Sequence, residues 1–133
     1  MKKTLFLFTI LTLFFTVLAL SSCKSLPEIP NDLTQAQIIQ KGQNAFSVGD
    51  YKVAEYYYQT SIQRYGNNTE SYIESKYELG HLYLKTKDYD KAEEAFNEIL
   101  ELYEYAAAGD LPPSYKKLAN IGLSKIPKKN NTK

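Results

Sequence analysis

Apolar residues recur along two stretches of the chain at the spacing of one helical face. In residues 51–65 this face is made of Ala54, Tyr58, Ser61, Ile62 and Tyr65. A matching face follows 38 residues later, at Ala92, Phe96, Ile99, Leu100 and Tyr103. Steps of three and four residues place side chains on one side of an α-helix, so each stretch is predicted to be a helix. The constant offset indicates a duplicated structural unit.

Another helix is predicted ahead of each of these faces. In "SYIESKYELGHLYLKT", the inner face consists of Leu79, Gly80, Tyr83 and Leu84. Capping boxes are predicted at the pairs Thr34–Gln37 and Ser71–Glu74. Glycine inside a helix costs about 1 kcal/mol relative to alanine, which close packing of a partner helix can offset. Gly42 and Gly80 are therefore predicted to lie where two helices approach closely.

A last helix is predicted after Pro112 and Pro113, since proline suits the first turn of a helix. Its apolar stripe is Leu118, Ala119, Gly122, Leu123 and Ile126. The predicted fold is all-α, a solenoid of two helical hairpins (residues 35–68 and 73–106) and a capping helix (112–126), in one domain over 34–126. Outside this packing, a solvated outer face is expected at Glu93, Glu94, Glu98, Glu101 and Glu104.

The first residues have a different pattern. Lys2 and Lys3 precede an uncharged apolar run, residues 5–20, which suits the core of a signal peptide and is short for a membrane span. The run ends in "LALSSC", which resembles the lipobox of bacterial lipoproteins. The resemblance implies that residues 1–22 are cleaved off between Ser22 and Cys23, and that Cys23 carries lipid such as palmitate. An ordinary secretory peptide, or an uncleaved anchor that contains a cysteine, is the alternative.

The two flanks of the domain are predicted to be irregular. Residues 23–33 are expected to form an extended tether, because Pro27 and Pro30 oppose helix formation. Residues 127–133 are expected to be a disordered basic tail. Two of the 16 basic residues lie in the leader, which leaves 14 against 15 acidic residues. This balance provides no strong positive field for nucleic acid.

The stretch "LGHLYLKTKDYDKAEEAFNEILELY" resembles a tetratricopeptide repeat, through Leu79, Gly80 and Tyr83, then Tyr89, Ala92 and Phe96. The earlier copy retains Gly42, Tyr51, Ala54 and Tyr58 but has Lys41 and Ala45 in place of the pattern's Leu and Tyr. Leu118-Ala119 resembles the opening of a third repeat that stops after one helix. The resemblance implies a curved stack whose first helices line a concave face.

That concave face is the predicted binding surface. Its candidate residues are Gln43, Ser47, Tyr77, His81, Lys85, Lys116 and Asn120. Aromatic, polar and cationic groups of this kind suit an extended or helical peptide. The alternative is that they are ordinary surface residues.

Catalysis is not expected. His81 is the only histidine, and the sequence has no Ser–His–Asp, metal-ligand or phosphate-loop pattern. No cofactor or metal is expected beyond the covalent lipid on Cys23.

A lipid-anchored repeat protein with a short tether resembles the BamD family of outer-membrane assembly lipoproteins. The resemblance implies a protein-binding role in β-barrel assembly at the periplasmic face of the outer membrane, and Lys24 after the cysteine favours that membrane. This chain departs from the family by having only about two and a half repeats. The alternative is a repeat lipoprotein that serves a periplasmic solute-transport system or acts as a general envelope scaffold.

Overall fold

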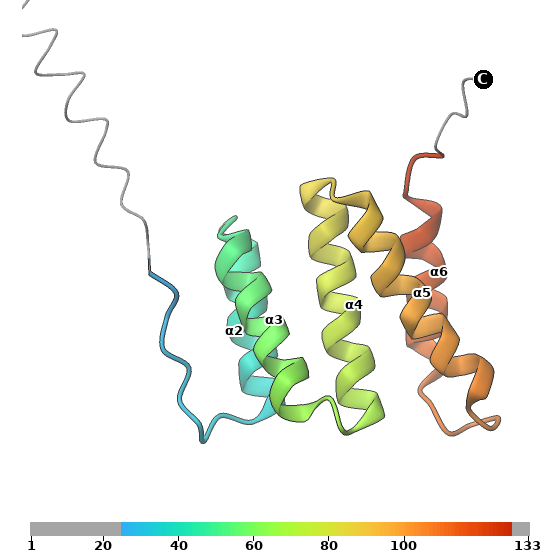
Figure 1. Cartoon of the computed structure of the whole chain (residues 1–133), viewed down its shortest axis with the longest axis horizontal. Coiled ribbons are helices and arrows are strands. Elements are labelled where there is room, and N and C mark those ends of the chain that lie inside the picture. The colour runs from blue at the N-terminus through green and yellow to red at the C-terminus, as the bar shows by residue number, and fades with distance from the viewer. Residues whose placement is uncertain (1–24, 129–133) are drawn as a thin grey trace, which may run out of the picture.

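A computed structural model describes residues 25–128, which form five α-helices (Figure 1). The helices are α2 (Gln35–Ser47), α3 (Tyr51–Tyr65), α4 (Thr69–Thr86), α5 (Tyr89–Tyr105) and α6 (Pro113–Ser124). The predicted signal peptide, the cleavage site at Ser22 and Cys23, and residues 129–133 of the predicted tail lie outside the described residues.

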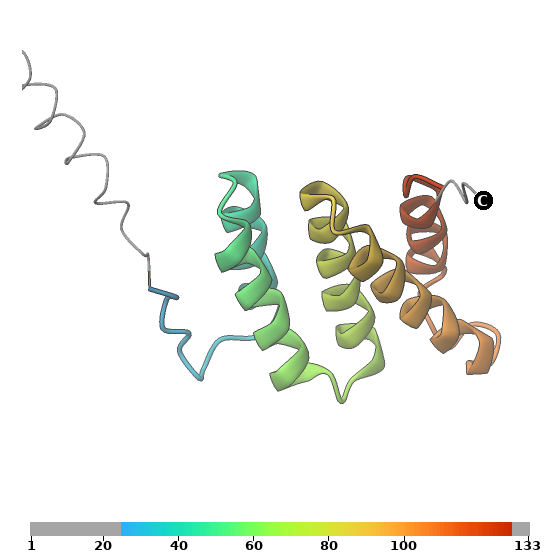
Figure 2. The same cartoon turned by 45° about the horizontal axis from the view of Figure 1, so that its top comes forward.

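The helices follow one another along a row, with α2 and α3 as one hairpin, α4 and α5 as the next, and α6 against α5 (Figures 1 and 2). Helix α4 also packs against α2 and α6. Among the described helices, α3 and α5 do not contact each other, so the stack is splayed on their side. We call the side of α2, α4 and α6 the concave side, and the side of α3 and α5 the convex side. The predicted all-α solenoid of two hairpins and a capping helix is confirmed.

The helix starts follow from their caps. At α2 the predicted capping box is confirmed, because the Thr34 hydroxyl accepts from the Gln37 backbone N–H and the Gln37 side chain accepts from the Thr34 N–H. At α4 the predicted box of Ser71 and Glu74 is wrong. Asn68 caps this helix by accepting from the Ser71 N–H at 2.9 Å, so Ser71 already lies inside the first turn. The second hairpin therefore begins at Thr69, ahead of the expected residue 73.

Helix α6 is shorter than predicted. It begins at Pro113 and ends at Ser124, so Ile126 lies beyond its last turn instead of within it. Ala119 and Gly122 are buried, and Leu123 and Ile126 pack at the edge of the second core cluster. The helix thus still covers the apolar face of the second hairpin.

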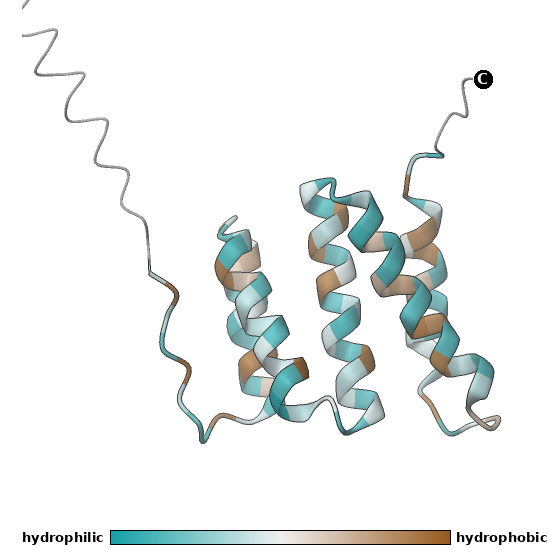
Figure 3. Cartoon of the chain, in the orientation of Figure 1, coloured by the Kyte–Doolittle hydropathy of each residue, from teal (hydrophilic) through white to brown (hydrophobic). Residues whose placement is uncertain are grey.

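The core divides into two clusters, and apolar patches recur along every helix (Figure 3). Tyr58 is the largest buried side chain of the first cluster, and Phe96 has that place in the second. A Cβ atom on Gly42 would lie 2.4 Å from the Tyr58 ring, and one on Gly80 would lie 2.7 Å from the Phe96 ring. Both glycines therefore permit close helix packing, as predicted.

Two expectations about the surface need correction. Glu98 is half-buried instead of solvated, since its carboxylate pairs with the Lys76 ammonium at 2.6 Å and accepts from the Tyr72 hydroxyl at 2.6 Å. The tether predicted over residues 23–33 is also not free along its whole length. Ile29 is buried, and Arg64 of α3 donates hydrogen bonds to the backbone at Ile29 and Pro30.

Candidate functional site

A line of ring contacts crosses the concave side from α2 to α6. Phe46 of α2 lies 5.2 Å from the His81 ring of α4, measured between centroids. His81 stacks on Tyr77, one turn earlier in α4, at 6.2 Å, and Tyr77 meets Tyr115 of α6 edge to face at 5.7 Å. We call Phe46, His81, Tyr77 and Tyr115 the aromatic row. His81 is exposed and the other three rings are half-buried, so the row forms part of the accessible surface.

The row rests on Phe96, which reaches the concave side from α5. Its ring lies 6.2 Å from Tyr77 and passes between α4 and α6. Cβ atoms on Gly80 and Gly122 would lie 2.7 Å and 2.4 Å from this ring, so side chains there would block its path. The two glycines thus allow a buried residue of the convex helix α5 to support the surface rings.

Two carboxylates of α4 accompany the row. Glu74 accepts from the Gln35 side-chain amide at 2.6 Å, and Glu78 accepts from the Gln43 amide at 2.8 Å. These bonds join α4 to α2 across the concave side. Neither carboxylate forms an ion pair with Lys or Arg in the described part of the chain.

The neighbouring phenols sense this charge. Burial, followed by the fields of Glu74 and Glu78, raises the pKa of Tyr115 to about 12. Burial and then Glu78 also raise the pKa of Tyr58, well above its usual value of 10. Both phenols are therefore neutral at physiological pH and serve as hydrogen-bonding and ring surfaces. The concave side combines aromatic rings with two carboxylates that lack a cationic partner.

Three of the seven sequence-predicted site residues come together here. Tyr77 and His81 belong to the aromatic row, and Gln43 lies beside it through Glu78. The other four do not join the row. Ser47 and Asn120 bond to backbone carbonyls of their own helices, at Asn44 and Lys116 respectively. Lys116 leans over the Tyr103 ring of α5, and Lys85 is exposed in the last turn of α4.

Sequence reasoning missed Phe46, Tyr115, Glu74 and Glu78. Phe46 and Tyr115 fall near the ends of α2 and α6, where the repeat pattern gave no position for them. Glu74 was taken for a capping residue. Both carboxylates could have been found by their spacing of four residues from each other and their nearness to Tyr77, which puts them on one side of α4.

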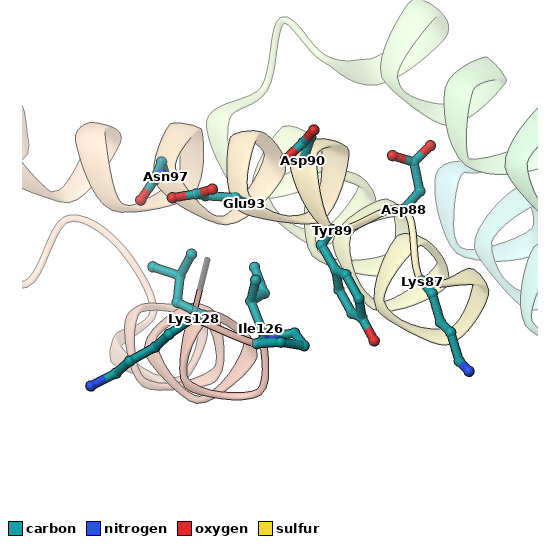
Figure 4. Close-up of a pocket in the computed structure, with 10 residues that line it drawn as sticks. Lys87, Asp88, Tyr89, Asp90, Glu93, Asn97, Ile126 and Lys128 are labelled. Carbon is teal, nitrogen blue, oxygen red and sulfur yellow. The ribbon is translucent and has the colours of Figure 1, made fainter. Parts of the chain in front are cut away.

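Hollows lie elsewhere on the molecule. On the convex side, two shallow pockets of about 370 and 460 Å³ share Tyr72 and lie between α3 and α5, over α4. Another, of about 620 Å³, lies between α5 and the end of α6, with Glu93 and Asn97 on one side and Ile126 and Lys128 on the other (Figure 4).

The pocket of Figure 4 has a filled counterpart in the first hairpin. There Tyr83 donates its hydroxyl to Glu55 at 2.7 Å, and Glu93 stands 38 residues after Glu55. Beside Glu93 the pocket is lined by Leu123, which has no hydroxyl. The hollow is therefore a packing difference between the two halves, and its polar side chains do not converge on a common point.

Two general findings limit the chemistry. Within residues 25–128, no group of three or more His, Cys, Asp or Glu side chains could hold a metal ion. In the same part of the chain, no helix has the length and apolar character needed to cross a membrane.

Comparisons with known proteins agree with the fold. The profile of the tetratricopeptide repeat family matches residues 34–104. An uncharacterized protein of Treponema pallidum (strain Nichols) is 34% identical over 113 residues, which cover 83% of this chain. The aligned part is 45% of that relative, so the chain spans less than half of the relative's length. No solved structure matches this chain.

Proposed function

Because the chain belongs to the tetratricopeptide repeat family, we propose that it is a non-enzymatic scaffold that binds another protein of the bacterial envelope through its concave side. Domains of this family typically bind proteins and are not catalytic. The observation that carries the proposal is the aromatic row, which joins α2, α4 and α6 into one accessible surface. A solenoid presents an extended surface of this kind to a peptide segment.

The chemistry of the row specifies the partner segment. Glu74 and Glu78 are held by neutral amides and are open to a cation, and the adjacent rings offer faces on which a cation can rest. A segment that carries Lys or Arg next to an apolar or aromatic side chain fits this surface. Lys85 and Lys116 lie away from the two carboxylates and do not compete for them.

Attachment to the membrane forms the second part of the proposal. The "LALSSC" sequence at the end of the apolar leader supports cleavage after Ser22 and lipid on Cys23. The uncharged leader and the single cysteine at this position are the observations behind it. With Lys24 next to the lipidated residue, the proposed location is the periplasmic face of the outer membrane.

The specific role that we favour is a BamD-like component of β-barrel assembly. Its support is the combination of lipobox, short tether and repeats, which this chain shares with that family in shortened form. A partner in solute transport or a general envelope scaffold would use the same fold and the same anchor. The partner therefore has to be identified by experiment.

Two measurements test these statements. Replacing Cys23 with Ala should abolish lipid labelling and partitioning into detergent; retention of both would contradict the anchor. For the role, the lipidated protein is cross-linked in cells and purified alongside a Tyr77→Ala/His81→Ala variant. A β-barrel assembly component that is recovered with the wild type and lost with the variant is the expected result. A transporter or solute-binding subunit in its place would exclude the barrel-assembly role.

A further inference from the structure

The segment before α2 is docked on the end of α3. The single arginine of the chain, Arg64, uses both arms of its guanidinium: Nη1 donates to the Pro30 carbonyl at 2.7 Å and Nη2 donates to the Ile29 carbonyl at 2.8 Å. The next residue, Tyr65, donates its hydroxyl to the Leu33 carbonyl. The Ile29 side chain is only 6% exposed. Three backbone carbonyls of residues 29–33 are thus held by two neighbouring residues of the last turn of α3.

The local sequence explains why this docking is possible. Proline fixes its own φ angle and biases the preceding residue toward extended backbone, and Pro27 and Pro30 do so on both sides of Ile29. An extended segment leaves its carbonyls without helix or sheet partners, so they can accept from Arg64. Guanidinium presents its donors in a planar fork, which suits two neighbouring acceptors better than the single ammonium of lysine would.

We propose that Arg64 and Tyr65 form a latch that shortens the free membrane tether and holds the α3–α4 end of the stack next to the lipid surface. The proposal rests on the lipid anchor at Cys23 proposed above and adds an orientation to it. A tether of ten residues, from Cys23 to Leu33, could reach about 35 Å when fully extended. With the latch closed, only six residues separate Cys23 from Ile29, and the reach falls to about 20 Å.

This difference decides which end can approach the bilayer. Helix α3 has 15 residues and is about 22 Å long, so its two ends differ in distance from the latch by about the length of the shortened tether. The near end is the α3–α4 turn at Gly66 to Asn68, and the far end is the α2–α3 turn at Val48 and Gly49. A closed latch therefore favours the near end at the membrane, whereas a free ten-residue tether would let either end approach.

The near end also has a surface that suits the lipid boundary. Tyr105, the most exposed large apolar side chain, is 81% exposed and lines a hollow together with Gly66 and Thr69. Tyrosine is favoured at membrane–water boundaries, where its ring and its hydroxyl meet different surroundings. The turn itself, Gly66 to Thr69, carries no charge. Val48, 80% exposed at the far end, provides the matched site for comparison.

The absence of tryptophan from the sequence makes the orientation measurable. Tryptophan is introduced at Asn67 or at Val48 of the lipidated protein, which is placed in vesicles that carry a dansyl headgroup lipid. Energy transfer to dansyl should be at least twofold stronger from position 67 than from position 48. In an Arg64→Ala background the two should become nearly equal, while Gln63→Ala, an exposed neighbour, should leave the ratio unchanged.

Equal transfer from the two positions in the latched protein would overturn the proposal, and so would an unchanged ratio in Arg64→Ala. Helix content by circular dichroism is checked for each variant. If Arg64→Ala does not fold, Arg64→Lys replaces it and should reduce the ratio, because one ammonium cannot hold both carbonyls in the same geometry.

The failure of the anchor and the failure of the latch can be told apart. A protein without lipid on Cys23 would not bind vesicles at all, which contradicts the proposed anchor. The chain from Cys23 onward, which contains every described helix, is then coupled through this single cysteine to a maleimide lipid. The same ratio, measured on the coupled protein, supports or overturns the latch.

Discussion

Tyr58 of the first hairpin and Phe96 of the second occupy the same position in the repeat, but their neighbours differ. The Tyr58 ring faces one glycine, Gly42, and shares its cluster with Leu79 and Leu82 of α4. The Phe96 ring lies between two glycines, Gly80 and Gly122, and shares its cluster with Ala119 of α6. Small residues on α6 let this helix approach α5 closely, where α4 meets α3 with leucines. The same register can therefore be closed by large or by small side chains.

The polar positions of the two hairpins differ as well. In the second hairpin Lys76, Glu98 and Tyr72 form a bonded group between α4 and α5. Thirty-eight residues earlier, Ile38 and Thr60 stand in the places of Lys76 and Glu98. Ile38 is fully buried, and the Thr60 hydroxyl bonds to the backbone of its own helix. The repeat thus fixes the backbone arrangement and leaves the chemistry of individual contacts free to vary.

The largest expected effect comes from removing the ring between the two glycines. Phe96→Ala should lower the free energy of unfolding by about 3–5 kcal/mol, since a fully buried aromatic side chain is lost and a cavity remains. Urea unfolding of the variant measures the loss. It should be accompanied by faster hydrogen exchange in α6, whereas Tyr58→Ala should affect α2 and α3 first. Tyr105→Ala, at an exposed site, is the control and should cost less than about 0.5 kcal/mol.

Overpacking at equivalent alanines should show where the hairpins are alike. Ala54 and Ala92 are both fully buried at the same repeat position. Ala92→Leu should cost about 1–3 kcal/mol, and Ala54→Leu a similar amount, because each added side chain meets a packed helix. Glu94→Leu, on the exposed face of α5, should change stability by less than about 0.5 kcal/mol. Comparable losses in Ala92→Leu and Glu94→Leu would contradict the repeat register.

A smaller effect is expected at the glycine that only the second hairpin meets. Gly122→Ala gains about 1 kcal/mol of helix propensity. It also places a Cβ atom 2.4 Å from the Phe96 ring, and overpacking typically costs about 1–3 kcal/mol. The net loss should be about 1 kcal/mol, measured by thermal and urea unfolding. Combining it with Phe96→Ala, which removes the clash, should turn the loss into a gain; losses that simply add would show that the ring is not the obstacle.

The smallest effect concerns pH. Burial alone would raise the pKa of Glu98, but the hydrogen bonds from Lys76 and Tyr72 together lower it below its usual value of 4.5. A lowered pKa in the folded state stabilises the protein above about pH 4.5, and this contribution is lost as the pH falls through the folded pKa. The carboxylate is partly exposed, so the contribution should stay below about 1 kcal/mol. Unfolding measured at pH 5 and pH 3 should show a smaller loss in Glu98→Gln than in the wild type; equal losses would exclude this pair as a source.

Much of this architecture could be predicted from the sequence. The 38-residue offset defined both hairpins, and the glycines at 42 and 80 were correctly assigned to close helix contacts, because helical spacing and residue size are local properties. The cap at Asn68 was missed because Ser71 and Glu74 match the spacing of a capping box equally well. The docked segment was missed because proline predicts extended chain but does not say what that chain lies against.

The candidate site was harder to predict than the fold. Tyr77 and His81 were found from their place on a first helix, but Lys116 and Asn120 were assigned to the same face by analogy and turn to other contacts. Contacts between α4 and α6 depend on how closely Gly122 lets the helices approach, which no single segment reveals. Glu98 was taken for surface because its partner Lys76 lies on a different helix, 22 residues away.

The central claim is that a partner protein lies across the aromatic row and not in the hollows of the convex side. A photoreactive residue placed at His81, in the row, or at Gln63, beside the convex pocket, tests this claim in cells. Both positions are exposed, so both can react. The account predicts one strong adduct with an envelope protein from position 81 and at least tenfold less of it from position 63. The same adduct from position 63, with none from position 81, would contradict it.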